Sequence, residues 1–362
     1  MIPRFRLWLV IILITCGTAY SQDSLDHASL PAGKTRLIIL NPTIGNLENF
    51  MRLIEFHAIS IPNLELVGVY HPKQHYDFKK SLDYLKNHPD LPIRLYPIKN
   101  NLDPDSLFCP NACTQKFYTL FKTSHGTLAL GGPDIPPAVY QAETHLTTAI
   151  VDPWRHYFET SYLFHLLGGN RNPEFKPFLE SNPTYVVMGF CLGMQTMNVA
   201  AGGTLIQDIP SQIYQIMTLD SVFRLPDDRI HKNYWFNLPV NLESMMSYHL
   251  HSIAWISSPS WLKSPIQPLV CSAHHQCVDQ LGQGFSLIAT SLDGKIPEIM
   301  IHQSYPKVIG VQFHPEYSDI YDPEFRFRRH PGDSLQSLLP LLNANGTIEF
   351  YRRLWAYYLD FN

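Results

Sequence analysis

The stretch Tyr185-Val-Val-Met-Gly-Phe-Cys-Leu-Gly193, followed by the apolar segment 194–201, decides the fold. Residues 185–188 form a short apolar run, which predicts a buried strand, and residues 194–201 predict a helix that ends at Gly202-Gly203. Between them Cys191 stands on a tight turn, with one glycine two positions before it and another two positions after it. Such a turn exposes a nucleophilic side chain at the end of a sheet.

The position of Cys191 also predicts its chemistry. The helix that follows puts a partial positive charge near the sulfur, which favours the thiolate, and leaves backbone N–H groups free to bind an oxyanion. The alternative is a buried cysteine flanked by two loop glycines. The strand-turn-helix context favours the nucleophile.

A cysteine nucleophile needs a base, and the base needs an orienting acid. His314-Pro315-Glu316 supplies both, directly after a predicted strand at 308–313. His314 is expected to take and return the proton, and Glu316 to fix the tautomer of His314 and stabilise its imidazolium. The fold must bring this pair to Cys191.

The first part of the chain alternates between predicted strands and helices. Buried-strand patterns cover 36–41, 64–70, 93–97 and 127–130, and helical patterns cover 49–60, 78–85 and 114–121. This alternation predicts an α/β fold with a mostly parallel central sheet flanked by helices. A helix at 154–167, two strands around an Asp293-Gly294 turn within 285–301, and a terminal helix near 348–359 are also expected. Residues 210–270 show no regular period.

Composition sets the class of protein. The chain has 362 residues, of which 45% are hydrophobic and 16% charged, enough apolar surface for a core. The net charge is −4, so no basic field argues for a nucleic-acid partner. Six cysteines do not make a disulfide scaffold, and Cys109 and Cys113 could pair or stay free. We expect one domain over residues 22–362.

Residues 1–21 are typical of a secretory signal peptide. Arg4 and Arg6 precede the apolar run 7–15, and Ala19 and Ser21 are small residues before a cut at Gln22. An exported, periplasmic or extracellular protein follows from this interpretation. An uncleaved membrane anchor and a lipid attachment at Cys16 are the alternatives.

These motifs together resemble the class I glutamine amidotransferase superfamily, and within it the peptidase C26 branch that includes γ-glutamyl-γ-aminobutyrate hydrolase. The resemblance lies in the nucleophile motif 189–195, the motif 313–316, and three further stretches within 131–140, 202–210 and 272–294. It covers about residues 127–318 and implies the flavodoxin-like fold of that superfamily.

The resemblance also implies roles for individual residues. Cys191, His314 and Glu316 would form the catalytic triad. The implied oxyanion hole consists of backbone N–H groups of Gly132 and Leu192, and the implied substrate-binding residues are Gln195, His274, His275 and Gln276. Arg155 and Glu159 resemble a structural helix motif of the branch.

Two positions depart from the branch. Leu192 follows the nucleophile where the branch commonly has arginine, and His156 follows Arg155 where an acid is common. The group that leaves the γ-glutamyl moiety therefore stays open.

The leading function is hydrolysis of a γ-glutamyl amide through a thioester at Cys191. The alternatives are a glutaminase subunit that delivers ammonia to a partner and an inactive binding protein on this scaffold. No synthase domain is visible in the chain, and a homodimer is left open. No cofactor is expected, and no metal, because His274 and His275 are adjacent and no third ligand is suggested.

Overall fold

The computed structural model describes residues 33–238, 245, 247–262 and 266–361. The expected signal peptide and Cys16 lie outside these residues. Fourteen strands are assigned within the described ranges: β1 Thr35–Leu40, β2 Leu64–Tyr70, β3 Ile93–Pro97, β4 Gly126–Ala129, β5 Val186–Phe190, β6 Leu205–Ile206, β7 His249–Trp255, β8 Leu269–Ser272, β9 Cys277–Val278, β10 Phe285–Ser291, β11 Pro297–His302, β12 Val308–Val311, β13 Arg326–Phe327 and β14 Gln336–Ser337. The α-helices in the same ranges are α1 Ile44–Glu55, α2 Phe78–Asn87, α3 Thr114–Lys122, α4 Pro153–Leu167, α5 Leu192–Ala200, α6 Leu219–Val222, α7 Leu338–Ala344 and α8 Thr347–Tyr358.

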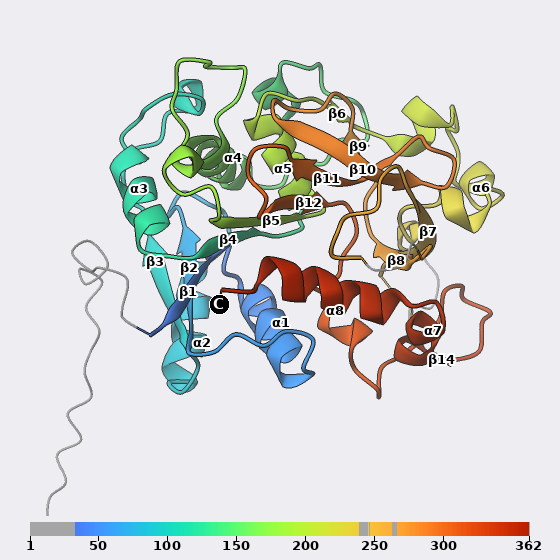
Figure 1. Cartoon of the computed structure of the whole chain (residues 1–362). Coiled ribbons are helices and arrows are strands. Elements are labelled where there is room, and N and C mark those ends of the chain that lie inside the picture. The colour runs from blue at the N-terminus through green and yellow to red at the C-terminus, as the bar shows by residue number, and fades with distance from the viewer. Residues whose placement is uncertain (1–32, 239–244, 246, 263–265, 362) are drawn as a thin grey trace, which may run out of the picture.

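A ten-stranded sheet in the order β3-β2-β1-β4-β5-β12-β11-β10-β7-β8 forms the centre of the molecule (Figure 1). The first six strands are parallel, as the alternating pattern predicts. The last four continue the sheet in antiparallel fashion. The expected mostly parallel sheet with flanking helices is therefore confirmed.

Helices cover both faces of this sheet (Figure 1). Side chains alternate between faces along a strand, and β1 shows the result: Leu37 and Ile39 pack into one core, Ile38 and Leu40 into the other. The first core contains residues of α1, α7 and α8, and the second contains residues of α3, α4 and α5. Burial on both faces explains why β1 is a continuous apolar run.

The segment 210–270, which has no sequence period, contains β7 and β8 together with short helical turns. Both strands join the antiparallel side of the sheet. The predicted strands within 285–301 are β10 and β11, and Gly294, with φ of 75°, lies in the loop that joins them.

The first helix begins earlier than its apolar spacing predicts. The prediction placed it at 49–60, and the structure places α1 at Ile44–Glu55. The hydroxyl of Thr43 accepts a hydrogen bond from the N–H of Asn46 and caps the helix there. His57, with φ of 54°, has left the helical conformation.

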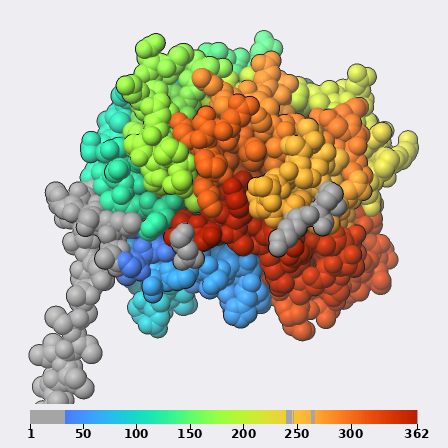
Figure 2. All heavy atoms as spheres, in the orientation of Figure 1, coloured from blue at the N-terminus to red at the C-terminus, as the bar shows by residue number. Residues whose placement is uncertain are grey.

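The two ends of the described chain adjoin on one face. Figure 2 shows the red C-terminal residues beside the blue N-terminal ones. No helix among the described residues has the length and apolar character needed to cross a membrane. The five described cysteines carry free thiols, so Cys109 and Cys113 are not paired in this structure.

The packing of β4 against α5 predicts the effect of one substitution. A Cβ atom at Gly193 would collide with the carbonyl oxygen of Ala129, a backbone atom of β4. We expect Gly193→Ala to lower the free energy of unfolding by about 2–3 kcal/mol in urea denaturation. Gly45→Ala is the matched control, because Gly45 is exposed in α1 and no atom lies within 4 Å of its added Cβ. Equal losses in the two variants would contradict the packing argument.

Candidate active site

Cys191 lies on a strained turn between β5 and α5. Its φ of 51° and ψ of −107° place a non-glycine residue in a sparsely populated conformation. Its backbone N–H donates to the carbonyl oxygen of Val311 in β12, 2.8 Å away. A Cβ at Gly189 would meet Met197 and Gly193, so the strand and the helix approach as closely as the flanking glycines allow. The nucleophile turn predicted from 189–193 is present.

Three neighbouring parallel strands bring the predicted catalytic residues to one edge of the sheet. β4, β5 and β12 are adjacent, and their carboxyl ends lead into Gly131-Gly132, Cys191 and His314 respectively. Ligand sites of open α/β sheets lie at this edge. A Cβ at Gly131 would lie 2.9 Å from Cε1 of His314 and 3.7 Å from Cβ of Cys191, so all three loops converge.

His314 is held between an acid and the cysteine. Its Nδ1 lies 2.7 Å from Oε1 of Glu316. Burial alone would lower the pKa of His314, but Glu316 and Cys191 raise it to about 10. The imidazole therefore carries a proton at neutral pH.

Tyr317 is a further residue of this site that the motifs did not identify. Its ring stacks on the imidazole of His314, with centroids 4.1 Å apart and an angle of 7° between the planes. The hydroxyl of Tyr317 lies 3.4 Å from Nε2 of His314. Tyr317 follows the His314-Pro315-Glu316 motif directly, and an aromatic residue at that place was the only available signal.

The predicted oxyanion hole lies beside the cysteine. Leu192 is the first residue of α5, where backbone N–H groups have no acceptor within the helix. A Cβ at Gly132 would lie 3.0 Å from the Leu192 side chain, so the glycine loop and the helix start are adjacent. Both predicted donors are thus next to the cysteine.

Arg155 holds the glycine loop. Its Nη2 donates to the carbonyl oxygens of Leu130 at 3.2 Å and Gly131 at 2.9 Å, and its Nε donates to Glu159 at 2.8 Å. Both side chains are buried in α4. The structural interpretation of Arg155 and Glu159 agrees with these contacts, which fix the loop next to His314.

Hydrogen bonds from two other parts of the chain hold the His314-Pro315-Glu316 loop. Asn49 of α1 accepts from the N–H of Ser318 at 2.9 Å and donates to the carbonyl oxygen of Glu316 at 2.5 Å. Tyr321 donates to the carbonyl oxygen of Pro315 at 2.9 Å and accepts from Trp355 of α8 at 3.1 Å. No sequence motif marks Asn49 or Tyr321 as a residue that holds this loop.

The four expected substrate-binding residues do not share one environment. Gln195 is buried and donates through Nε2 to the backbone oxygen of Gln276 at 3.2 Å and to Gln312 at 3.3 Å. Among the described residues, the side-chain amide of Gln276 has no hydrogen-bond partner. His274 turns away into a buried group of histidines.

His275 joins two loops. Its Nε2 lies 3.1 Å from the carboxylate of Asp134, after β4, and its Nδ1 lies 3.3 Å from that of Asp208. Burial lowers the pKa of His275, but the hydrogen bonds and charges of the two aspartates raise it to about 9. At neutral pH His275 is a cation between two carboxylates.

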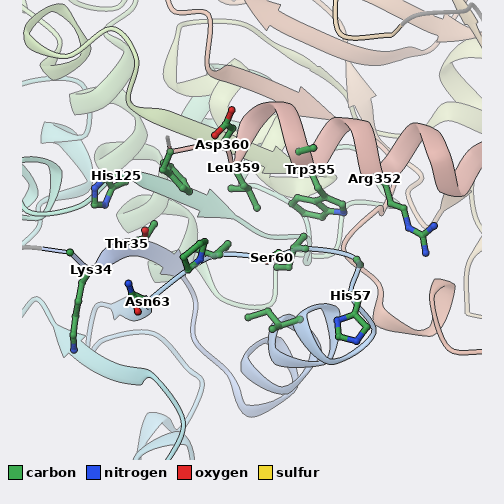
Figure 3. A pocket seen from close by; sticks show the side chains of 18 residues that line it. Lys34, Thr35, His57, Ser60, Asn63, His125, Arg352, Trp355, Leu359 and Asp360 are labelled. Carbon is green, nitrogen blue, oxygen red and sulfur yellow. The ribbon is translucent and has the colours of Figure 1, made fainter.

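Two cavities lie at opposite ends of the parallel strands. One of about 370 Å³ lies at the edge just described and is lined by Gly45, Asn46, Asn49, Leu130, Gly131, Gly132, Glu316 and Tyr317. A larger one of about 1120 Å³ lies at the opposite edge, near the start of β1, between α8 and residues 57–63 (Figure 3). Figure 3 shows His57, Trp355 and Arg352 around it. Of the predicted catalytic triad, Glu316 lines the smaller cavity, together with Gly132 of the predicted oxyanion hole.

The ion pairs of His275 predict a pH dependence of stability. The pKa of His275 is raised from its ordinary 6.5 to about 9, so its contribution is complete below pH 6.5 and is lost as the pH rises through about 9. We expect the stability difference between the wild type and His275→Gln to shrink by about 3 kcal/mol between about pH 6 and pH 9.5. Urea denaturation at each pH measures it, and a constant difference would contradict the assignment.

Comparison with known proteins identifies the family to which the chain is similar. The sequence pattern of the family described as peptidase C26 matches residues 107–316, more than half of the chain. A glutamine amidotransferase-like protein of Lactococcus lactis is 31% identical over 186 residues, which cover 51% of this chain and 63% of that protein. A glutamine amidotransferase-like protein of Rickettsia prowazekii is 28% identical over 207 residues, which cover 52% of this chain and 68% of that protein.

Among solved structures, a glutamine amidotransferase of Thermotoga maritima aligns over 90% of this chain and 98% of its own, with 11% identity and a TM-score of 0.40. The chain spans less than two thirds of the Lactococcus lactis relative. The family pattern includes the glycine loop, the cysteine turn and the His314-Pro315-Glu316 loop. This chain therefore belongs to the peptidase C26 family, whose relatives have a hydrolase or glutamine amidotransferase-like function.

Proposed function

We propose that the protein hydrolyses γ-glutamyl amide bonds, with Cys191 as nucleophile. The observation that carries this proposal is the convergence of Cys191 and the His314–Glu316 pair at one edge of the sheet, with His314 Nδ1 2.7 Å from Glu316. A cysteine paired with a protonated imidazole is the activated form of this nucleophile. The neighbouring cavity of about 370 Å³ suits a small substrate.

In the first step the Cys191 thiolate attacks the γ-carbonyl carbon of the substrate. Negative charge develops on the carbonyl oxygen, and the N–H groups of Leu192 and Gly132 are the proposed donors that stabilise it. The C–N bond then breaks as His314 gives its proton to the leaving nitrogen. The products are a γ-glutamyl thioester on Cys191 and a free amine.

In the second step water attacks the thioester carbon. His314, now neutral, takes one proton of the water, and the C–S bond breaks to regenerate the thiolate and release the γ-carboxylic acid, which loses its remaining proton to solvent. Glu316 keeps Nδ1 of His314 protonated in both steps, so Nε2 is the atom that exchanges the proton.

A glutaminase subunit is the second candidate, because the relatives are named as glutamine amidotransferase-like proteins. It would use the same thioester and would deliver the released ammonia to a partner. Turnover by the purified chain alone separates the two. Hydrolysis of γ-glutamyl amides without a second protein or nucleotide supports the proposal, and activity only with a partner supports the subunit.

We expect Cys191→Ala to lower kcat/KM for a chromogenic γ-glutamyl amide by at least about 10⁴-fold, because no other group forms the thioester. Cys109→Ala is the matched control, since Cys109 is a half-buried free thiol on another loop and its loss should leave turnover unchanged. Circular dichroism checks that both variants fold. Wild-type turnover by Cys191→Ala would exclude Cys191 as the nucleophile.

The roles of His314 and Glu316 predict an order of losses. We expect Glu316→Gln to cost about 10–10³-fold in kcat, because the amide oxygen still accepts the imidazole N–H but brings no negative charge to the imidazolium. His314→Ala removes the proton carrier and should cost more. Steady-state rates of both variants on one substrate measure the order. If Glu316→Gln is as inactive as Cys191→Ala, the orienting role of Glu316 is wrong.

A further inference from the structure

A second group of chemically reactive side chains lies inside the molecule, apart from Cys191. His231, His251, His274 and Glu298 each direct one potential ligand atom into a common space, and these atoms all lie within 4.8 Å of one another. His231 lies between the short helical turns Asp227–Arg229 and Tyr234–Asn237, His251 lies in β7, His274 in the loop after β8, and Glu298 in β11. The sequence suggested no third ligand near His274, and the fold supplies three.

Two spacings within the group fit a metal ion. Nδ1 of His231 lies 3.4 Å from Oε1 of Glu298, and Nε2 of His251 lies 3.6 Å from the same oxygen. Ligand atoms about 2.0–2.1 Å from a tetrahedral zinc ion are about 3.3–3.4 Å apart. Both distances are therefore close to the edge of a zinc tetrahedron and are long for hydrogen bonds.

The histidines are oriented as metal ligands are. Nδ1 of His274 donates to the carbonyl oxygen of Gln276 at 2.7 Å, and Nδ1 of His251 donates to that of Ser252 at 3.2 Å. A ligating histidine commonly donates its other ring N–H to such a carbonyl, which fixes the tautomer. In both rings the bare Nε2 lone pair then faces the group. Neither Nε2 has a hydrogen-bond partner among the described residues.

Protons on these four residues cannot pair all of their buried hydrogen-bond acceptors. His231, His251, His274 and Glu298 are 0–3% exposed, so bulk water does not reach them. With two Nε2 atoms as acceptors, a protonated Glu298 and the one N–H of a neutral His231 are the two donors that the group can provide. Two donors face four acceptors, one on each residue, so at least two buried acceptors stay unpaired. One cation accepts a lone pair from every residue.

The carboxylate of Glu298 lacks a hydrogen-bond partner inside the molecule. Glu298 is buried, and neither of its side-chain oxygens has a partner among the described residues. A buried divalent ion would provide the positive charge that such a carboxylate needs.

We propose that His231, His251, His274 and Glu298 form a closed structural site for one divalent transition-metal ion, with zinc as the ion that the three nitrogens and one carboxylate select. Four protein ligands fill a tetrahedron and leave no open position, so the ion acts on the fold and not on the substrate. The proposed metal site is linked through β11 to the edge of the sheet that carries Cys191 and His314. The backbone oxygen of Glu298 accepts from the N–H of Gln312, two residues before His314.

The ion would fasten the irregular segment before β7 to the sheet. The backbone oxygen of His231 accepts from the N–H of His274 at 2.9 Å and from the hydroxyl of Ser272 at 2.8 Å. The ion adds a bond from the same residue to β7 and β11. It also fixes His274, next to the His275 that joins Asp134 and Asp208.

The test begins with the metal content of the full chain, produced with a purification tag that contains no histidine and purified without chelator. Elemental analysis of protein from zinc-supplemented medium should find about one zinc ion per chain. Protein produced with cobalt in place of zinc should show the visible absorption bands of tetrahedral Co²⁺ with nitrogen and oxygen ligands. Protein that contains less than about one tenth of an ion per chain under both conditions overturns the proposal.

Single substitutions locate the ion. His251→Gln and Glu298→Gln should each lower the metal content at least about tenfold. His249→Gln is the matched control, because His249 is buried on the same strand, two residues from His251, and its Nε2 contacts the backbone oxygen of Asp227 outside the group. It should keep about one ion per chain. Retention of the ion by both ligand variants, or its loss from all three, contradicts the assignment.

The proposal can be tested even if the ligand variants fail to fold, because the cobalt spectrum is measured on the wild-type protein. A spectrum of six-coordinate Co²⁺, or one that Glu298→Gln leaves unchanged, contradicts a closed site. Removal of zinc by a chelator should also lower Tm of the wild type and of His249→Gln, and leave that of Glu298→Gln unchanged. An equal effect of the chelator on all three would exclude the four residues as the site.

Discussion

The turn at Cys191 is the constraint on which the site depends. A strand must end and a helix must begin within one residue, and Cys191 accommodates this with a φ of 51°. The turn is held because Gly189 and Gly193 let β5, α5 and β4 approach to backbone contact, and because the N–H of Cys191 donates to β12. The strained residue persists because the surrounding packing and hydrogen bonds fix its conformation.

The rest of the site follows from the order of the strands. With β4 and β12 on either side of β5, the glycine loop and the His314-Pro315-Glu316 loop must end next to the sulfur. Arg155 and Asn49 then fix these loops through backbone oxygens, one from each face of the sheet. The candidate site therefore depends on helices from both cores and not only on Cys191, His314 and Glu316.

Much of this arrangement is predictable from the sequence. Residues 185–201 and 313–316 are local patterns, because a strand, a turn and a helix each leave a signature within a few residues. β7 and β8 leave none: residues 210–270 are aromatic and irregular, and these strands are defined by pairing with each other and with β10. Pairing between distant residues is not visible in a local pattern.

The same limit applies to individual side chains. Arg155 was interpreted as structural, but its acceptors are backbone oxygens that no motif marks. His274 and His275 are neighbours in the sequence and point in opposite directions, one into the buried histidines and one towards two carboxylates. Alternation along an extended loop predicts such a divergence, but only the fold shows what each ring meets.

The central claim is that Cys191 carries the γ-glutamyl group as a thioester. The most direct measurement is mass spectrometry of the protein after rapid mixing with a γ-glutamyl amide and acid quench, followed by proteolysis. We expect the peptide that contains Cys191 to gain the mass of one γ-glutamyl group. Treatment with hydroxylamine, which cleaves thioesters, should remove this gain. Substrate turnover with no adduct on Cys191 at any time, or an adduct on another residue, would contradict it.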